Sequence, residues 1–200
     1  MKRILKRLVL VILTSVFIPL IVIGQTGIID SMVIYDWQLK SNTIGNPNFN
    51  VGVDSQNNQH DWILDMGDNM EMAYKGMQDW GAVFITIGDA FEDSVRDLRI
   101  SDDYSRFNYF YVDLKGKVGK ELLEIALKDK FDPNNGNETK VPIEVTDKWV
   151  TYKIPLGDFR TADLERLHVV TIFLFRGIVP RTVYFKNIRF IKKNTVVIKD

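Results

Sequence analysis

The chain has 200 residues, of which 46% are hydrophobic and 26% are charged, and its 26 basic residues balance its 26 acidic ones. This length and composition allow one domain with a substantial core. The balanced charge gives no net field that would attract nucleic acid, and the absence of cysteine excludes disulfides, thiol catalysis and thiolate metal sites.

The first 24 residues have the pattern of an export signal. Basic residues at the very start precede an uncharged apolar run from Leu8 to Gly24. The small residue at the end of the run fits signal cleavage, yet the run approaches the ~20 apolar residues that can cross a bilayer. The sequence therefore predicts either a signal peptide or an N-terminal membrane anchor over residues 1–24. Residues 25–200 are then exported, to the periplasm, the cell surface or the extracellular space.

From Thr26 onward the chain reads as short strands. Runs rich in Val, Ile, Phe, Tyr and Thr alternate with Gly, Asn, Asp and Pro, and no segment of convincing length has a helical period. Strands are predicted over residues 28–35, 69–75, 82–87, 107–115, 122–128, 141–145, 149–154, 168–175 and 182–191. This pattern predicts an all-β fold, a two-sheet antiparallel β-sandwich of the jelly-roll type.

Three polar stretches are predicted to lie between or after these strands. Residues 41–61 read as a long loop or a hairpin, and residues 88–105 read as an acidic loop. Residues 192–200 read as a last edge strand or a frayed tail.

Two predicted strands carry outward side chains that suit a sugar. Period two turns the polar and aromatic residues of 109–113 and 124–128 away from the core. If these strands are neighbours, one face carries the candidate ligand contacts Tyr109, Tyr111, Asp113, Glu124 and Lys128. Aromatic rings stack on the C–H faces of sugars, while carboxylates and amines bond their hydroxyls. The alternative is that the tyrosines only cover a curved sheet.

Trp80 and Arg176 are further candidates. Trp80 reads as a sugar platform or as a plug in the core, and the sequence does not separate the two roles for the other tryptophans either. Arg176 ends an apolar strand, where it reaches the rim of a cleft or lies in a solvated turn.

No catalytic residues are predicted. The two histidines, His60 and His168, have no metalloprotease spacing, and G-x-S-x-G, P-loop and G-x-G-x-x-G motifs are absent. Asp113 and Glu124 would meet the separation that a glycosidase pair needs, but so would most acidic pairs on one sheet face. We therefore expect a protein that is not an enzyme.

Five stretches in order resemble a known family. They are "MEMAYKGMQDWGAVFITIG" (70–88), "YSRFNYFYVDLKG" (104–116), "ELLEIALKDK" (121–130), "WVTYKIPLGDF" (149–159) and "TVYFKNIRF" (182–190). Together they resemble the galactose-binding-like jelly roll of carbohydrate-binding modules, particularly modules similar to family 11 and its relatives, over about residues 28–191. The resemblance implies non-catalytic binding of a polysaccharide chain on the concave sheet.

The resemblance also implies a structural calcium ion, which the last stretch puts in question. The family's Asp falls at Lys186, and an ammonium group cannot ligate calcium, which takes oxygen donors. We therefore expect no cofactor, with Asp30 and Asn187 as the remaining oxygen donors. An alternative is that Lys186 pairs with Asp30 or Asp36. A β-bulge at Lys186 and Asn187 is also predicted, because Phe185 and Ile188 then both point inward.

The sequence thus predicts an exported carbohydrate-binding protein. Its partner is a polysaccharide or oligosaccharide, it binds no nucleic acid, and it meets a membrane only through an uncleaved N-terminal segment. Two alternatives stay open, a structural or protein-interaction and assembly domain on the same fold, and a small glycan-active enzyme.

Overall fold

The computed structural model describes residues 31–35, 49–59, 61–88, 99–132 and 135–192, and it consists mainly of β-strands. The strands are β1 (Ser31–Tyr35), β2 (Phe49–Ser55), β3 (Ile63–Asp65), β4 (Met70–Tyr74), β5 (Trp80–Ile87), β6 (Tyr109–Gly116), β7 (Glu121–Asp129), β8 (Lys140–Val145), β9 (Val150–Pro155), β10 (Leu167–Arg176) and β11 (Arg181–Ile191). Two single-turn 3₁₀ helices, η4 (Leu156–Asp158) and η5 (Leu164–Arg166), lie between β9 and β10. Within the described ranges no helix has the length and hydropathy to cross a bilayer.

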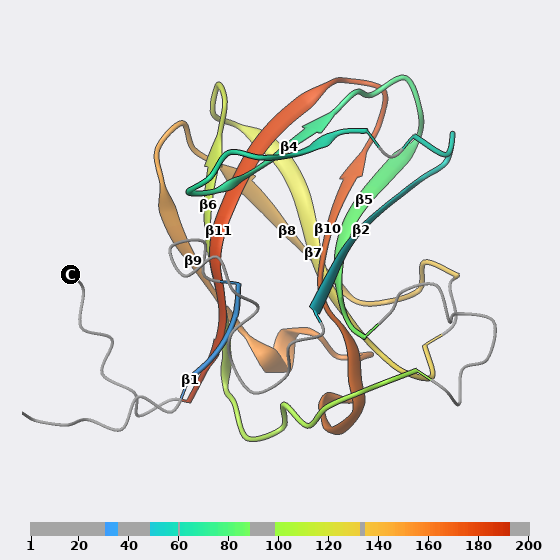
Figure 1. The fold of residues 1–200 in the computed structure, drawn as a ribbon, viewed down its shortest axis with the longest axis vertical. Coiled ribbons are helices and arrows are strands. Elements are labelled where there is room, and N and C mark those ends of the chain that lie inside the picture. The colour runs from blue at the N-terminus through green and yellow to red at the C-terminus, as the bar shows by residue number, and fades with distance from the viewer. Residues whose placement is uncertain (1–30, 36–48, 60, 89–98, 133–134, 193–200) are drawn as a thin grey trace, which may run out of the picture.

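The strands form two antiparallel sheets that pack face to face (Figure 1). Sheet A has the order β3-β4-β11-β6-β9, with β1 also paired to β11, and sheet B has the order β2-β5-β10-β7-β8. The predicted two-sheet antiparallel β-sandwich is confirmed.

The chain crosses between the sheets at most of its turns. The strand order places β4 in sheet A, β5 in sheet B, β6 in sheet A and β7 in sheet B, and β9, β10 and β11 alternate in the same way. β6 and β7 are therefore not neighbours, and the condition for one shared ligand face is not met. A tight turn, with Gly119 at φ 89° and Lys120 at φ 68°, carries the chain over the core, so that the apolar sides of the two strands face each other.

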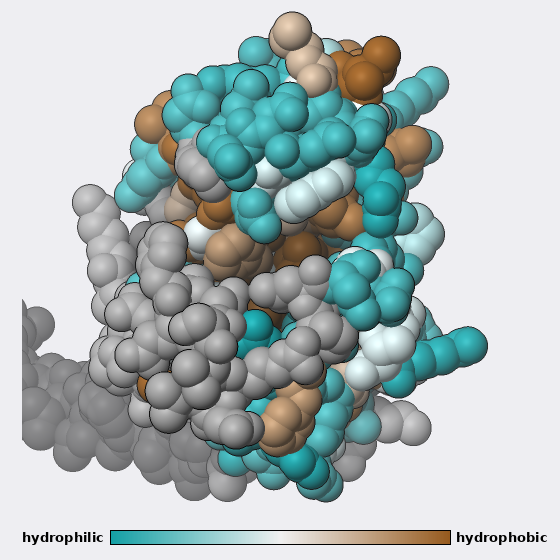
Figure 2. Space-filling view, turned by 90° about the vertical axis from the view of Figure 1, so that its right-hand side faces the viewer, coloured by the Kyte–Doolittle hydropathy of each residue, from teal (hydrophilic) through white to brown (hydrophobic). Residues whose placement is uncertain are grey.

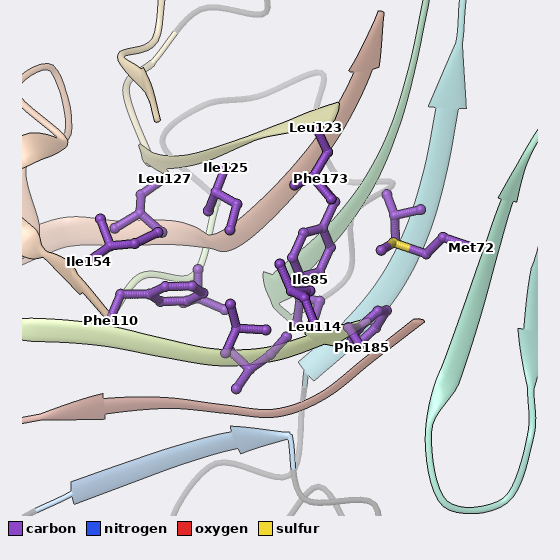
Figure 3. Packing of buried hydrophobic residues seen from close by; sticks show 14 of the residues in the cluster. Met72, Ile85, Phe110, Leu114, Leu123, Ile125, Leu127, Ile154, Phe173 and Phe185 are labelled. Carbon is purple, nitrogen blue, oxygen red and sulfur yellow. The ribbon is translucent and has the colours of Figure 1, made fainter. Parts of the chain in front are cut away.

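The core lies between the sheets, and each strand contributes about every second side chain to it. Figure 3 shows Phe110 and Ile154 of sheet A pointing toward Leu127 and Phe173 of sheet B. Each of the four side chains is 4% exposed or less, and burial of such a side chain contributes ~2 kcal/mol. Trp62 belongs to this core, where its Nε1 donates to the Gln59 carbonyl at 2.9 Å, so its role is that of a plug.

The predicted bulge in β11 is confirmed. The register with β6 shifts between Lys186 and Arg189, and Asn187 has φ 53°. Phe185 and Ile188 are both fully buried on either side of it.

All nine predicted strands are present with small differences at their ends, but two further strands were not predicted. β2 lies inside the stretch expected as a polar loop or hairpin, and β3 follows it. The strand pattern of β2 is weak because the strand contains Asn50, Gly52 and Asp54, which are typical of turns. A strand still forms here because β2 is an edge strand, which is paired on one side only. The tail from residue 193 and the acidic segment 89–98 lie outside the described residues.

Candidate functional site

The outer face of sheet B carries a cleft of about 430 Å³. Its lining comes mainly from β5 and β10, with Lys128 of β7, residues 135–140 and Arg99 at one end. Figure 2 shows this side of the molecule, with hydrophobic residues in a hollow and hydrophilic residues above it and to its right. A cavity of this size, with an apolar floor and polar rim, is the usual form of a ligand site.

The floor of the cleft is apolar and aromatic. Period two along β5 turns Trp80, Ala82 and Phe84 to the outer face, and Ile172 and Leu174 of β10 lie beside them. Trp80 and Phe84 are half-buried, and four residues of strand separate their Cα atoms by ~13 Å. The two rings therefore form separate platforms along one line, which suits an extended ligand.

Gly52 of β2 fixes the position of the Phe84 ring. The two residues are cross-strand partners, and a Cβ added at Gly52 would lie 2.4 Å from Cε2 and from Cζ of Phe84. The ring consequently lies over the glycine backbone, in space that any other residue would fill.

A charged cluster occupies one end of the cleft. Glu138 lies between Lys128 Nζ at 3.7 Å and Lys140 Nζ at 3.3 Å, and its side chain is 8% exposed. Burial alone would raise the pKa of Glu138, but its own backbone N–H and the two ammonium groups outweigh burial and leave that pKa below its usual value. Glu138 is therefore held ionised at neutral pH.

Backbone contacts hold two more polar side chains at this end. Arg99 Nη1 donates to the carbonyls of Lys130 at 3.3 Å and of Asp132 at 3.1 Å. His168 Nδ1 lies 2.8 Å from the carbonyl of Ile100, and both side chains line the cleft. Sequence reasoning missed Arg99, Glu138 and Lys140, since they lie outside strands or at a strand's first residue, and no local pattern marks them.

An ion pair lies at the opposite end of the cleft from this charged cluster. Arg176 Nε donates to Glu124 Oε2 at 2.8 Å, and Arg176 is the cross-strand partner of Trp80. Both charged side chains remain partly exposed, so they can also bond a ligand's hydroxyl groups.

The structure divides the seven predicted ligand contacts between two faces. Trp80, Lys128 and Arg176 line the cleft, and Glu124 lies beside it. Tyr109, Tyr111 and Asp113 point outward from sheet A, because Phe110, Val112 and Leu114 are the buried residues of β6. The predicted set therefore does not share one face, and the cleft holds its sheet B members only.

The tyrosines on sheet A pack among cations. The ring centroids of Tyr109 and Tyr111 are 6.3 Å apart, and Lys153 Nζ lies 3.8 Å from the centroid of Tyr109. Asp113 accepts hydrogen bonds from Thr151 Oγ1 and from Asn187 Nδ2, each at 2.7 Å, which ties β6 to both neighbouring strands.

The described residues near the bulge do not fit a calcium ion. Lys186 Nζ lies 4.5 Å from the ring centroid of Trp149, and Asn187 points its amide donor at Asp113. The described part of the chain holds no cluster of three or more acidic or histidine side chains arranged for a metal. Asp30 and Asp36 lie outside the described residues, so a bond from either to Lys186, and the expected lack of a cofactor, stay predictions.

Comparison with known proteins connects this architecture to sugar binding. The family model described as Carbohydrate binding domain 30 matches residues 26–192. The fold is similar to the family 30 carbohydrate-binding module of a cellulosomal cellulase of Clostridium thermocellum, with 19% identity, a TM-score of 0.56, and coverage of 82% of this chain and 98% of that one. It is also similar to a family 11 module from Clostridium thermocellum in complex with a β-1,3-1,4-mixed-linked tetrasaccharide, with 17% identity, a TM-score of 0.54, and coverage of 81% and 95%. No curated protein matches the chain.

Proposed function

Because the chain belongs to the Carbohydrate binding domain 30 family, we propose that it holds a polysaccharide or oligosaccharide chain in the cleft of sheet B without changing it chemically. The observation that carries this proposal is the line of Trp80 and Phe84 on the cleft floor, bordered by paired polar side chains. Aromatic rings offer faces to the C–H side of successive sugars, and the polar rim bonds their hydroxyls.

Ion pairs neutralise much of the charge that lines the cleft, which suits an uncharged glycan. Glu138 neutralises part of the charge of Lys128 and Lys140, and Glu124 pairs with Arg176. Carboxylates and ammonium groups that are already paired bind hydroxyl groups well and select against a ligand that adds net charge. The mixed-linked tetrasaccharide bound by the similar family 11 module makes a β-glucan the first ligand to test.

Two features support a binding role without catalysis. A glycosidase acid needs a raised pKa, whereas the two lysines help to lower the pKa of Glu138. Asp113 and Glu124, the pair considered from the sequence, lie in different sheets and point to opposite outer faces. We extend the proposal to an exported protein, with residues 1–24 as a cleaved signal or a retained anchor.

Retention on gels that contain a polysaccharide tests the function. The full chain is run through gels with mixed-linkage β-glucan, mannan or xylan, beside Trp80→Ala and, as a control on the other face, Tyr109→Ala. We expect retention by at least one neutral glycan, and Trp80→Ala to weaken it about five- to tenfold, the equivalent of about 1 kcal/mol of ring stacking. Tyr109→Ala should leave it unchanged.

Two results would contradict the proposal. If every folded protein ran freely through every gel, a protein-interaction domain on the same fold would be favoured. If Tyr109→Ala abolished retention and Trp80→Ala did not, the glycan would bind sheet A instead of the cleft.

A further inference from the structure

The outer face of sheet A concentrates positive charge on three adjacent strands, β11, β6 and the edge strand β9. Four cations and three tyrosines on these strands, together with Trp149 just before β9, form what we name the cationic face: Lys115, Lys153, Lys186, Arg189, Tyr109, Tyr111, Tyr184 and Trp149. This face lies on the opposite side of the sandwich from the cleft.

Strand register arranges these residues in rows across the sheet. Arg189 of β11, Tyr111 of β6 and Lys153 of β9 are consecutive cross-strand partners, so a ring lies between two cations. The Arg189 guanidinium carbon lies 5.7 Å and Lys153 Nζ 5.9 Å from the centroid of Tyr111. In a second row, Lys115 is opposite Tyr184, with its Nζ 5.8 Å from that ring.

The positive charge of this face is not neutralised by ion pairs within the described residues. The ion pairs found there involve none of the four cations. The one carboxylate on these three strands is Asp113, the cross-strand partner of Lys186, and its two oxygens accept from Thr151 and Asn187 instead of forming an ion pair. Glu71 of β4 lies at the border and bonds the Tyr184 side chain. A cation over a ring keeps its full charge, so the face is suited to an anionic ligand.

We propose that the cationic face is a second binding surface, and that its ligand is an anionic polysaccharide with carboxylate or sulfate groups along the chain. Charges that repeat along a polymer match cations that repeat across neighbouring strands, and several weak contacts then act together. The aromatic rings hold the cations in place, and the ligand bonds the cations. The surface does not depend on the cleft, so either site can be tested alone.

The covered rings favour a polysaccharide over other polyanions. A single-stranded nucleic acid stacks its bases on open ring faces, whereas Lys153 Nζ lies 3.8 Å from the centroid of Tyr109. A lipid surface takes up apolar side chains that project into it, while Tyr109, Tyr111 and Tyr184 are half-buried beneath cations.

Two forms of one polymer distinguish binding that depends on charge from binding that depends on the sugar backbone. Retention of the full chain is measured on polygalacturonate, which carries a carboxylate on each sugar, and on the same backbone after complete methyl esterification. We expect retention on the charged form only, and we expect it to fade as salt rises to about 0.5 M, since exposed charges are screened. Equal retention on both forms, or retention that ignores salt, would overturn the proposal.

Substitutions on the cationic face test whether the charged polymer binds there. The pair Lys153→Gln and Arg189→Gln should weaken retention on polygalacturonate about three- to tenfold, in line with the modest strength of exposed ion pairs. A matched control replaces Lys117 and Arg160, which are exposed in turns, with Gln and removes the same charge without touching the face. An equal loss in the control, with both proteins folded, would show that net charge alone acts and would contradict the proposal.

Two further experiments test which class of ligand the cationic face binds and whether this face binds independently of the cleft. Trp80→Ala should keep full retention on polygalacturonate even where it loses a neutral glycan, and a parallel loss would place the polyanion in the cleft. Vesicles with anionic lipid should not bind through Lys153 and Arg189. If they did so while polygalacturonate did not, the face would be a membrane contact and the polysaccharide proposal would fail.

Discussion

At the scale of single residues, Gly52 decides how an aromatic ring lies in the cleft. Most of the glycines that the structure describes lie in turns, but Gly52 lies inside β2, where its missing side chain leaves room for Phe84. A glycine within a strand weakens that strand, so its presence here is explained by the close approach of the ring. The position of the Phe84 ring matters for the proposed function because the ring forms part of the cleft floor.

Gly52→Val is expected to separate binding from stability. The added side chain must displace the Phe84 ring, which should weaken β-glucan binding about three- to tenfold, from about 1 kcal/mol of lost stacking. Valine favours strands, so the free energy of unfolding should change by less than ~1 kcal/mol. Calorimetric titration and denaturant unfolding measure the two effects. Gly157→Ala is the control, since an added Cβ there meets nothing within 4 Å, and unchanged affinity in Gly52→Val would refute the role of the glycine.

At the scale of elements, the bulge in β11 determines which of its side chains enter the core and which lie on the cationic face. One extra residue, Asn187, lets Phe185 and Ile188 both enter the core while Lys186 and Arg189 stay outside. Its φ of 53° is tolerated by asparagine and glycine and is strained for β-branched residues. Its amide also holds Asp113, the centre of the contacts that tie β6 to β9 and β11.

Two substitutions at Asn187 separate backbone strain from the hydrogen bond. Asn187→Gly keeps the backbone conformation and loses the bond to Asp113, which should lower the free energy of unfolding by about 1 kcal/mol. Asn187→Val loses the bond and adds strain of ~1–2 kcal/mol, so its total loss should be about 2–3 kcal/mol. Denaturant unfolding measures both. Equal losses in the two variants would show that the positive φ costs nothing at this position.

The strands and their faces were predictable from sequence, whereas their neighbours were not. Alternation sets which side chains of one strand are inward, and it correctly assigned Phe110 and Leu114 to the core and the bulge to Lys186 and Asn187. Alternation carries no information on which sheet the next strand joins. Consecutive strands are usually neighbours, and this rule failed at β6 and β7 because the jelly roll alternates between sheets.

The same limit explains which parts of the site were missed. Trp80 and Arg176 could be named because one is a tryptophan and the other is a charge at the end of an apolar strand, although nothing in the sequence showed that they are cross-strand partners. Arg99 and Glu138 reach the cleft from connecting segments, where no period sets the direction of a side chain. β2, which holds Gly52, was hidden by residues typical of turns.

At the scale of the whole molecule, the sandwich presents two rigid faces with different chemistry. The outer face of sheet B has an apolar floor with paired charges, and the outer face of sheet A has rows of cations that form no ion pair among the described residues. The core separates the two surfaces, which share no residue. The proposed functions therefore make independent predictions for the two faces.

The most direct test of glycan binding in the cleft uses the tryptophans as reporters. Nuclear magnetic resonance resolves the indole N–H signal of each tryptophan, and single Trp→Phe variants assign the signals. Trp80 lies on the cleft floor, Trp62 in the core and Trp149 on the cationic face. On titration with a mixed-linked β-glucan oligosaccharide, we predict that the Trp80 signal shifts while those of Trp62 and Trp149 stay in place. A shift at Trp149 with an unmoved Trp80 signal would contradict the account, because it would place the glycan on sheet A.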